Sequence, residues 1–326
     1  MRVGTLDQIV GQTPLIELSS LSQKTGCRIF GKAEFLNPGA SVKDRAALGI
    51  IEKAELEGKL RPGMRIYEGT AGNTGIGLAT LAARRSYLCT IVIPNNQSLE
   101  KYQALEALNV ELVKVDAVPF ANPNHFYHTA QKLSQQDPLG FWANQFENLA
   151  NFEIHYRTTG PEIWEQSKNK VEIFATASGT GGTIAGVSRF LKEQSAKIQT
   201  VLIDPLGSGL HHWFHHKEIK SQGTSVTEGI GIMRMTANMK QAILDDAIQV
   251  DDNQMISMLY HLARYEGLLL GPSTALNVYG AYQLGMREKG SGKCIVTVLC
   301  DSATRYQSRV FNSAWIKEKN LKIDPI

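Results

Sequence analysis

Residues 37–45 (Asn-Pro-Gly-Ala-Ser-Val-Lys-Asp-Arg) carry the side chain best suited to covalent chemistry with an aldehyde, that of Lys43. A Pro-Gly pair ends the preceding strand, and Ser41 followed by Asp44 three residues later predicts a capping box at the start of a helix. Lys43 then lies in the first helical turn, where the helix macrodipole disfavours a cation. A lysine amine must be neutral to attack an aldehyde, so this position favours Schiff-base formation. The alternative for this segment taken alone is an ordinary capped helix with a solvated lysine.

A second turn, residues 68–77, joins a predicted strand to a predicted helix and is rich in small residues. Small residues let backbone N–H groups approach a ligand, and the start of a helix favours an anion. Thr70, Asn73 and Thr74 add polar side chains, so a carboxylate or a phosphate is the expected ligand. The glycine spacing differs from the G-x-G-x-x-G of dinucleotide-binding turns. The alternative is a tight strand-to-helix turn without a ligand.

A third turn, residues 178–183, has the composition of a phosphate-binding loop. It lies between a predicted strand and a predicted helix, and three glycines, two threonine hydroxyls and a helix N-terminus make a cradle for an anion. The turn contains no lysine of the Walker type, so a compact monophosphate fits better than a nucleoside triphosphate. A fourth turn, residues 271–274, is weak by itself, and Ser273 is expected there as an ordinary N-cap.

Together these turns offer a lysine amine, a site for a small anionic substrate and a site for a monophosphate. An aldehyde cofactor that carries a phosphate needs this combination of groups. We therefore expect the protein to bind pyridoxal 5'-phosphate.

The elements that must position these turns alternate between short β-branched runs and helical stretches. The predicted strands are 28–35, 64–67, 90–93, 110–115, 171–176, 200–203 and 293–299. The predicted helices are 46–57, 76–85, 99–108, 183–193, 253–265 and 276–288. This alternation predicts an α/β protein with twisted, mainly parallel sheets, whose ligands bind at the carboxyl ends of the strands. We expect two cores built from one interwoven chain, and an irregular, polar segment 204–229 that could cover a site.

The composition of the 326 residues excludes several classes of protein. Hydrophobic residues at 43% and charged residues at 20% are typical of a globular protein, and no apolar stretch is long enough to span a membrane. The net charge of +3 is scattered, so neither nucleic acid nor a membrane is an expected partner. The first seven residues lack the features of a signal peptide, which predicts a cytoplasmic protein. The four cysteines form no C-x-x-C pair and are expected to be buried free thiols.

Four histidines between residues 211 and 216 offer a possible metal site. Histidines four residues apart can share one face of a helix and bind zinc. No acidic or thiol ligand completes the set nearby, and H-E-x-x-H is absent. We therefore expect a histidine cluster without a physiological metal.

Five segments, in order along the chain, resemble the motifs of one enzyme family. They are residues 37–45, 69–77, 144–148, 158–164 and 179–183, and the similarity continues to residues 301–306. The chain resembles the cysteine synthases (O-acetylserine sulfhydrylases) of the cysteine synthase/cystathionine β-synthase family, which are fold-type II, or tryptophan synthase β-like, pyridoxal phosphate enzymes. For a chain of this family we expect a larger cofactor-binding domain of residues 1–46 and 154–326. A smaller, mobile domain of residues 47–153 is expected to close on the substrate.

The resemblance implies a role for individual positions. Lys43 would form the Schiff base with the cofactor and would then remove the α-proton of the substrate as a general base. Asn73 would hydrogen-bond the phenolic oxygen of the cofactor, and Ser273 would face its pyridine nitrogen. The residues that would bind the substrate's α-carboxylate are Thr70, Ala71, Gly72, Asn73, Thr74 and Gln145. Those that would bind the phosphate are Gly179, Thr180, Gly181, Gly182 and Thr183.

The reaction implied by the resemblance is a β-replacement that makes L-cysteine from O-acetyl-L-serine and sulfide through an α-aminoacrylate intermediate. Departures from the usual residues of the family occur at Ala71, Asn95, Asn96, Pro272 and Ala275. These departures leave related β-chemistry as an alternative: a cystathionine β-synthase, a cysteine desulfhydrase or a diaminopropionate-forming synthase. Another alternative is a weakly active paralogue that acts as a binding partner, for example of a serine acetyltransferase. The resemblance also implies a homodimer.

Overall fold

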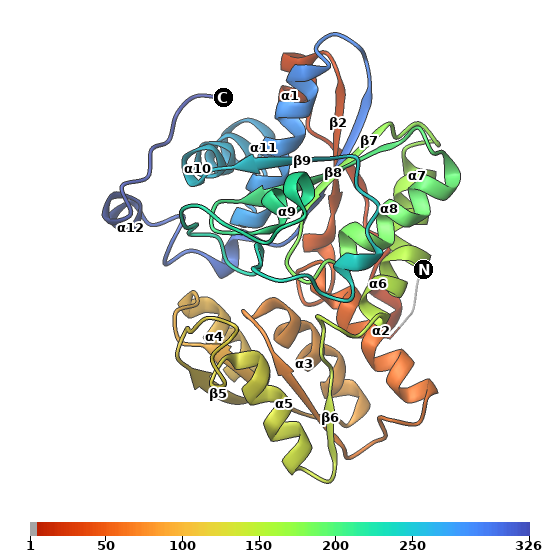
Figure 1. Ribbon diagram of the computed structural model, residues 1–326, viewed down its shortest axis with the longest axis vertical. Coiled ribbons are helices and arrows are strands. Elements are labelled where there is room, and N and C mark those ends of the chain that lie inside the picture. The colour runs from red at the N-terminus through yellow and green to blue at the C-terminus, as the bar shows by residue number, and fades with distance from the viewer. Residues whose placement is uncertain (1–4) are drawn as a thin grey trace.

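The computed structural model describes residues 5–326, which form two lobes stacked along the long axis of the molecule (Figure 1). Residues 1–4 lie outside the described residues. They are the start of the predicted larger domain, and they belong to the first seven residues, from which a cytoplasmic location is predicted. Each lobe contains one sheet with helices packed against it, and the predicted α/β class with mainly parallel sheets is confirmed. None of the described helices combines the length and the apolar character needed to cross a bilayer.

The upper lobe in Figure 1 is built on a six-stranded sheet with the order β1-β2-β10-β7-β8-β9. Its strands are β1 (Leu15–Glu17), β2 (Arg28–Ala33), β7 (Ile173–Ala177), β8 (Gln199–Pro205), β9 (Asp246–Val250) and β10 (Cys294–Leu299). Five strands run parallel, and only the edge strand β1 pairs in the antiparallel sense, with β2. Every residue of β7 and β10 is buried, because these central strands are covered on both faces.

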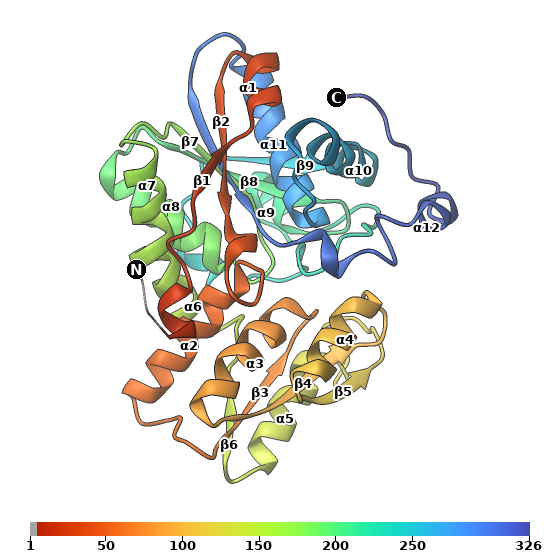
Figure 2. The same cartoon turned by 180° about the vertical axis from the view of Figure 1, so that it is seen from behind.

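Two apolar clusters lie on the two faces of this sheet. On one face Ile29 and Ile295 pack with the helices α10 and α11, which Figure 2 shows from behind. On the other face Phe174 and Val296 pack with α8. The helices of this lobe are α1 (Ser19–Thr25), α6 (Ala150–Ile154), α7 (Gly160–Gln166), α8 (Gly182–Gln194), α9 (Leu210–His216), α10 (Asp252–His261), α11 (Pro272–Arg287) and α12 (Ser313–Glu318).

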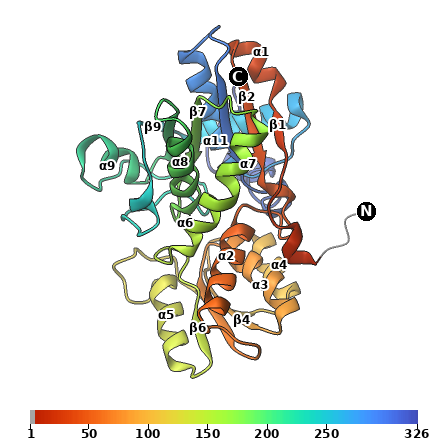
Figure 3. The same ribbon diagram turned by 90° about the vertical axis from the view of Figure 1, so that its right-hand side faces the viewer.

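The lower lobe contains a four-stranded sheet with the order β5-β4-β3-β6, in which every neighbouring pair is parallel. Its strands are β3 (Arg65–Gly69), β4 (Leu88–Pro94), β5 (Glu111–Val115) and β6 (Gly140–Trp142). Its helices are α2 (Lys43–Leu56), α3 (Asn73–Arg85), α4 (Leu99–Ala107) and α5 (Phe126–Gln136). Ile50, Ile66 and Leu78 belong to one buried cluster that joins α2, β3 and α3. Figure 3 shows this lobe from the side, below the six-stranded one.

Each strand and helix predicted from the sequence is present, with shifts at the ends. The strands that the sequence did not predict are β1, β6 and β9, and the unpredicted helices are α1, α5, α6, α7, α9 and α12. The segment 204–229, predicted to be irregular, contains the helix α9, so that prediction is wrong for residues 210–216. The predicted domain boundaries at 46/47 and 153/154, and the mobility of the smaller domain, stay predictions.

Two predicted helix caps are wrong. The helix α2 begins at Lys43, and Ser41 Oγ accepts a hydrogen bond from the Lys43 N–H at 3.2 Å, whereas the Asp44 carboxylate accepts from the Gly39 N–H outside the helix. The two side chains therefore do not form the reciprocal pair of a capping box. Ser273 is not an N-cap either, because α11 already begins at Pro272.

Candidate active site

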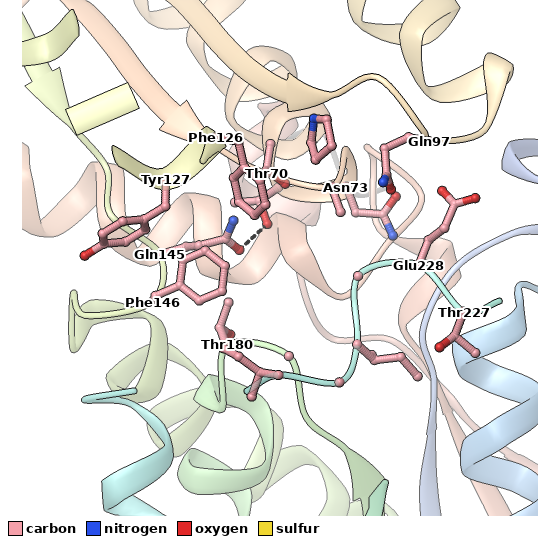
Figure 4. Close-up of a pocket in the computed structure, with 18 of the residues that line it drawn as sticks. Thr70, Asn73, Gln97, Phe126, Tyr127, Gln145, Phe146, Thr180, Thr227 and Glu228 are labelled. Atoms are coloured by element: carbon pink, nitrogen blue, oxygen red, sulfur yellow. Dashed lines mark hydrogen bonds between the residues drawn. The ribbon is translucent and has the colours of Figure 1, made fainter. Parts of the chain in front are cut away.

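A cavity of about 420 Å³ lies between the two lobes, where segments that follow strands of both sheets meet (Figure 4). Thr70 directly follows β3, and Cys300 directly follows β10. Gly179 lies two residues after the end of β7, and Pro94 is the last residue of β4. The cavity therefore lies at the carboxyl ends of the strands, where ligands of α/β sheets bind.

Lys43, the first residue of α2, lines this cavity. Burial lowers the pKa of its amine, while the neighbouring Cys300 thiol and Asp301 carboxylate oppose that shift. The fully buried lysines Lys32 and Lys101 pair with glutamates, but Lys43 takes part in none of the ion pairs formed by residues 5–326. A buried amine with a lowered pKa and no carboxylate partner is suited to nucleophilic attack and to proton transfer.

The turn between β3 and α3 is shaped by one glycine and one internal hydrogen bond. Gly72 has a φ of 127°, and its N–H donates to Thr70 Oγ1 at 3.0 Å. A Cβ at Gly72 would lie 2.7 Å from Lys101 Cδ, so the position also lacks room for a side chain. This turn places polar groups at the N-terminus of α3, where an anion is stabilised. The residues of the turn that line the cavity are Thr70, Ala71, Asn73 and Thr74.

Gln145 comes from a distant part of the chain and joins this turn, as Figure 4 shows. Thr74 Oγ1 donates to Gln145 Oε1 at 2.5 Å, and Gln145 Nε2 donates to Glu68 Oε1 at 3.0 Å. Burial raises the pKa of Glu68 to about 8, although the hydrogen bonds from Gln145 oppose the shift. The two contacts fix the orientation of the Gln145 amide beside the turn.

The turn between β7 and α8 has the backbone of an anion-binding loop. Gly181 has a φ of 91°, and a Cβ there would lie 2.6 Å from Met239 Cα, so only glycine fits. Thr180 Oγ1 accepts a hydrogen bond from Asn151 Nδ2 at 2.9 Å. The first N–H groups of α8 have no acceptor within the helix, and they lie where the macrodipole favours negative charge.

A smaller cavity of about 20 Å³ is lined by this turn and adjoins the larger one. The two cavities share Lys43, Cys300 and Thr180 in their walls. Lys43 thus lies at the junction between the anion-binding turn at residues 179–183 and the chamber that holds the turn at residues 70–74.

Ser273 and Cys300 form a further part of the wall of the larger cavity. Burial raises the pKa of the Cys300 thiol to about 12, which keeps the thiol neutral near pH 7. Asn277 Nδ2 donates to Cys300 Sγ at 3.3 Å and holds the thiol in place. Two neutral side chains of this kind suit a neutral heteroaromatic nitrogen better than a protonated one.

The structure brings most of the predicted site residues together. Those that line the larger cavity are Lys43, Thr70, Ala71, Asn73, Thr74, Gln145, Gly179, Thr180 and Ser273. Gly181 and Thr183 line only the smaller cavity, while Gly72 and Gly182 line neither and instead shape their turns. The roles assigned to these residues individually stay predictions.

Charged residues that the sequence did not single out close one side of the cavity. Lys101 on α4 forms a buried ion pair of 2.6 Å with Glu228, which belongs to the upper lobe. Arg309 pairs with the same carboxylate at 2.8 Å. Nothing local in the sequence marks this cluster, because Lys101 and Glu228 are 127 residues apart.

An aromatic wall, also missed from the sequence, surrounds Arg234. The Arg234 guanidinium lies 4.3 Å from the ring centre of Phe120, 4.9 Å from that of Tyr127 and 5.0 Å from that of Phe146. These distances fit cation–π contacts. Tyr127 and Phe146 can be seen in Figure 4. Burial, together with His128 and Arg234, lowers the pKa of His125 to about 4, so this imidazole is neutral near pH 7.

The histidine cluster lies on α9, where His211 meets His215 edge to face and His212 contacts His216 with tilted rings, with ring centres 4.7 Å and 4.4 Å apart. Within residues 5–326, no three or more His, Cys, Asp and Glu side chains are grouped so as to hold a metal ion. All four cysteines are free and buried, which confirms that prediction.

The residues around the two cavities fit pyridoxal phosphate. Lys43 supplies an amine for the aldehyde, and the turn at residues 179–183 supplies backbone donors for the phosphate. Asn73 and Ser273 supply polar groups from two other elements for the ring of the cofactor.

Comparisons with known proteins agree with this fit. The family model described as "Pyridoxal-phosphate dependent enzyme" matches residues 6–301. The chain is 47% identical to cysteine synthase 1 of Neurospora crassa, over 96% of this chain and 84% of that protein. It is 36% identical to a cystathionine beta-synthase of Apis mellifera, over 96% of this chain and 62% of that protein. The crystal structure of a hydrogen sulfide-producing enzyme from Fusobacterium nucleatum matches with a TM-score of 0.86 and 31% identity, over 94% of this chain and 100% of that one.

These similarities confirm the family and the cofactor that the motifs around Lys43 and Gly179 predict. The chain belongs to the family of pyridoxal-phosphate dependent enzymes.

Proposed function

We propose that this enzyme makes L-cysteine from O-acetyl-L-serine and sulfide by β-replacement. The observation that carries the proposal is the position of Lys43 at the junction of two anion-binding sites, where its amine has no ion-pair partner among the described residues 5–326. One site suits the phosphate of the cofactor, and the other suits the carboxylate of an amino acid. The choice of reaction is supported by the similarity to cysteine synthases over nearly the whole chain.

Four of the predicted site residues have separate tasks in this proposal. Pyridoxal phosphate, when bound, withdraws electrons from the amino acid and makes its α-proton acidic. Lys43 accepts that proton as general base, since a lowered pKa increases the neutral fraction of its amine. Thr74 and Gln145, which are hydrogen-bonded to each other, hold the α-carboxylate beside the N-terminus of α3. Ser273 presents a neutral hydroxyl to the pyridine nitrogen.

The predicted smaller domain, residues 47–153, is proposed to move as the mobile domain that closes on the substrate. Lys101 belongs to the lower lobe and Glu228 to the upper one, so their ion pair forms only when the lobes are together. A closed cavity keeps water away from the reacting groups and strengthens the electrostatic contacts inside it.

A second candidate function is β-replacement with a thiol amino acid, or release of sulfide from cysteine. It is favoured by the 36% identity to a cystathionine beta-synthase and by the likeness to a hydrogen sulfide-producing enzyme. The cavity also extends beyond Lys43 to the aromatic wall around Arg234, which leaves space for a nucleophile larger than sulfide. We further propose a cytoplasmic homodimer, with a serine acetyltransferase as a candidate partner.

The decisive experiment combines absorbance with product analysis. Purified protein is expected to be yellow and to form cysteine from O-acetylserine and sulfide, and Lys43→Ala is expected to lose both properties. Lys53→Ala, which removes a lysine on the outer part of the same helix, is the matched control and should keep both. Products formed with homocysteine or with cysteine alone separate the second candidate from the first. A colourless wild-type protein that forms none of these products would contradict the proposal.

A further inference from the structure

The carboxamide of Asn73 is held at both ends by residues of the other lobe. Its nitrogen Nδ2 donates to Asp301 Oδ2 at 2.6 Å, and its oxygen Oδ1 accepts from Arg305 Nη1 at 2.5 Å. The two ends of a carboxamide have nearly the same shape, so only such partners decide which end points where. Here the two contacts allow one orientation only.

Asp301 is itself fixed and fully buried, at 0% exposure. Its Oδ2 also accepts the Tyr306 hydroxyl at 2.6 Å, and its backbone forms a β-bridge with Ser41, two residues before Lys43. Gly271 lies against the carboxylate so closely that a Cβ would be only 3.0 Å from Asp301 Cγ. The carboxylate that holds Asn73 is thus tied to the segment that carries Lys43.

Arg305 completes the arrangement from the same segment. Its second nitrogen, Nη2, donates to the carbonyl oxygen of Gly39, in the turn that precedes Lys43. Asp301 and Arg305 therefore join the start of α3 to the start of α2 across the boundary between the lobes. Asn73 and Lys43 both line the cavity.

We propose that Asp301 and Arg305 are positioning residues that fix the Asn73 amide so that it offers a hydrogen-bond donor, and not its oxygen, to the cofactor. This inference rests on the proposed function and on the role that the family resemblance implies for Asn73, a hydrogen bond to the phenolic oxygen of pyridoxal phosphate. An amide nitrogen has two N–H groups, and one of them is used by Asp301. The other remains for an oxygen on the cofactor ring, while Arg305 occupies the amide oxygen.

The burial of Asp301 fits a positioning role better than a purely structural one. A buried carboxylate is expensive to desolvate, and an apolar side chain would pack a lobe boundary at lower cost. One of its two oxygens, Oδ1, has no hydrogen-bond partner among residues 5–326. The carboxylate therefore does not serve to pair a full set of buried hydrogen-bond donors. The donors that it does satisfy are those of Asn73 and Tyr306.

The test is a double-mutant cycle with Asn73→Ala, Asp301→Ala and the double variant, each loaded with pyridoxal phosphate. The readouts are the visible absorption spectrum of the bound cofactor, its dissociation constant and the rate of the spectral change on adding O-acetylserine. Asp301→Ala is expected to slow that change on the order of 10- to 100-fold, as when outer partners of a metal ligand are removed. The double variant should be no worse than Asn73→Ala, because Asp301 acts through Asn73.

Two further variants keep the test decisive if Asp301→Ala folds poorly: a conservative change at Asp301 and a change at a buried aspartate that does not line the cavity. Asp301→Asn retains one oxygen acceptor and should recover most of the rate and the spectrum. Asp204→Ala is the matched control: it removes another fully buried carboxylate of the upper lobe, whose Oδ2 accepts the His211 N–H at 2.8 Å. It should lower the melting temperature without changing the spectrum.

The proposal is overturned if the effects of Asn73→Ala and Asp301→Ala multiply in the double variant, since Asp301 would then act independently. It is also overturned if Asn73→Ala leaves the spectrum and the rate unchanged. In either case a wild-type enzyme that still makes cysteine leaves the proposed function standing, whereas failure of that function is seen in the wild type itself.

Discussion

Lys101 and Glu228 form a buried ion pair of 2.6 Å between the two lobes, at the edge of the cavity that contains Lys43. Arg309 shares the carboxylate of Glu228, and Ser98 donates to it from the lower lobe. The contacts between the lobes thus include a buried cluster of charged side chains. Removing one member of such a cluster is destabilising, because its partner is then left buried without a counter-charge.

Glu228→Ala is expected to lower the free energy of unfolding by about 3–5 kcal/mol, because Lys101 is left buried without a partner. Chemical denaturation of the cofactor-free protein measures this change. The control is Asp246→Asn, which breaks the exposed ion pair with Arg287 and should cost less than about 1 kcal/mol. Replacing both partners, as in Lys101→Met with Glu228→Leu, should recover most of the loss. Equal effects of Glu228→Ala and Asp246→Asn would show that the buried pair does not stabilise the joined lobes.

Lys43→Met is expected to stabilise the cofactor-free protein near pH 7, because burial lowers the pKa of the Lys43 amine from its usual value of 10.5. Between the lowered pKa and 10.5 the unfolded chain binds more protons at this residue than the folded protein. The wild type therefore gains stability as the pH rises through that window, by at most about 1.4 kcal/mol per pH unit.

Urea unfolding from pH 7 to pH 10 should accordingly show the advantage of Lys43→Met shrinking as the pH increases. Lys53→Met, on the same helix but at 35% exposure, should show no such trend. A constant difference between Lys43→Met and the wild type would mean that the amine of Lys43 is solvated.

Glu68 is expected to change the stability of the protein with pH in the direction opposite to Lys43. Burial raises the pKa of its carboxyl group from 4.5 to about 8, so the folded protein binds more protons than the unfolded chain between these values. The stability that Glu68 contributes is present below pH 4.5 and is lost as the pH rises toward 8. Relative to Glu68→Gln, the wild type should lose up to about 1.4 kcal/mol per pH unit across this range.

Unfolding curves of the wild type and Glu68→Gln at pH 5 and at pH 8 check this expectation, with the exposed Glu106→Gln as the control. Weaker binding of the substrate in Glu68→Gln is expected as well, since Glu68 fixes the amide of Gln145. The same difference at both pH values would show that Glu68 is ionised in the folded protein throughout.

Parts of the fold with a strong local signal could be predicted from the sequence. All six residues of β10 are buried, and the run of β-branched residues before Cys300 predicts such a central strand without its neighbours. The strand β6 has only three residues and no such run, so its place depends on pairing with β3. The helix α5 was not predicted. It begins at Phe126 and Tyr127, directly after a loop with two prolines.

The same distinction holds for the candidate site. The turns that carry Lys43, Asn73 and Gly181 could be found because small and polar residues follow strands at those places. Asp301 could not be assigned to Asn73, because they are 228 residues apart and meet only when the two lobes pack together. An aspartate after a strand is common in any α/β sequence, so the sequence does not mark Asp301 as a partner of Asn73. The tertiary structure is needed to identify hydrogen-bond partners that lie so far apart in the chain.

Gly181→Ala tests whether the turn before α8 needs its glycine for shape. The φ of 91° is unfavourable for alanine, and the new Cβ would lie 2.6 Å from Met239 Cα. Strain in the backbone costs roughly 1–2 kcal/mol and overpacking roughly 1–3 kcal/mol, so a loss of about 2–5 kcal/mol in the free energy of unfolding is expected. Because the N–H groups of this turn would shift, pyridoxal phosphate should also dissociate more readily.

Gly267→Ala separates the two costs, because Gly267 has a φ of 67° but nothing within 4 Å of the position of a Cβ. It should cost only about 1–2 kcal/mol and leave the affinity for the cofactor unchanged. Urea unfolding and absorbance titration with pyridoxal phosphate measure both quantities for both variants. If Gly181→Ala and Gly267→Ala behave alike, the contact with Met239 relaxes without disturbing the turn, and the packing of this glycine does not shape the phosphate site.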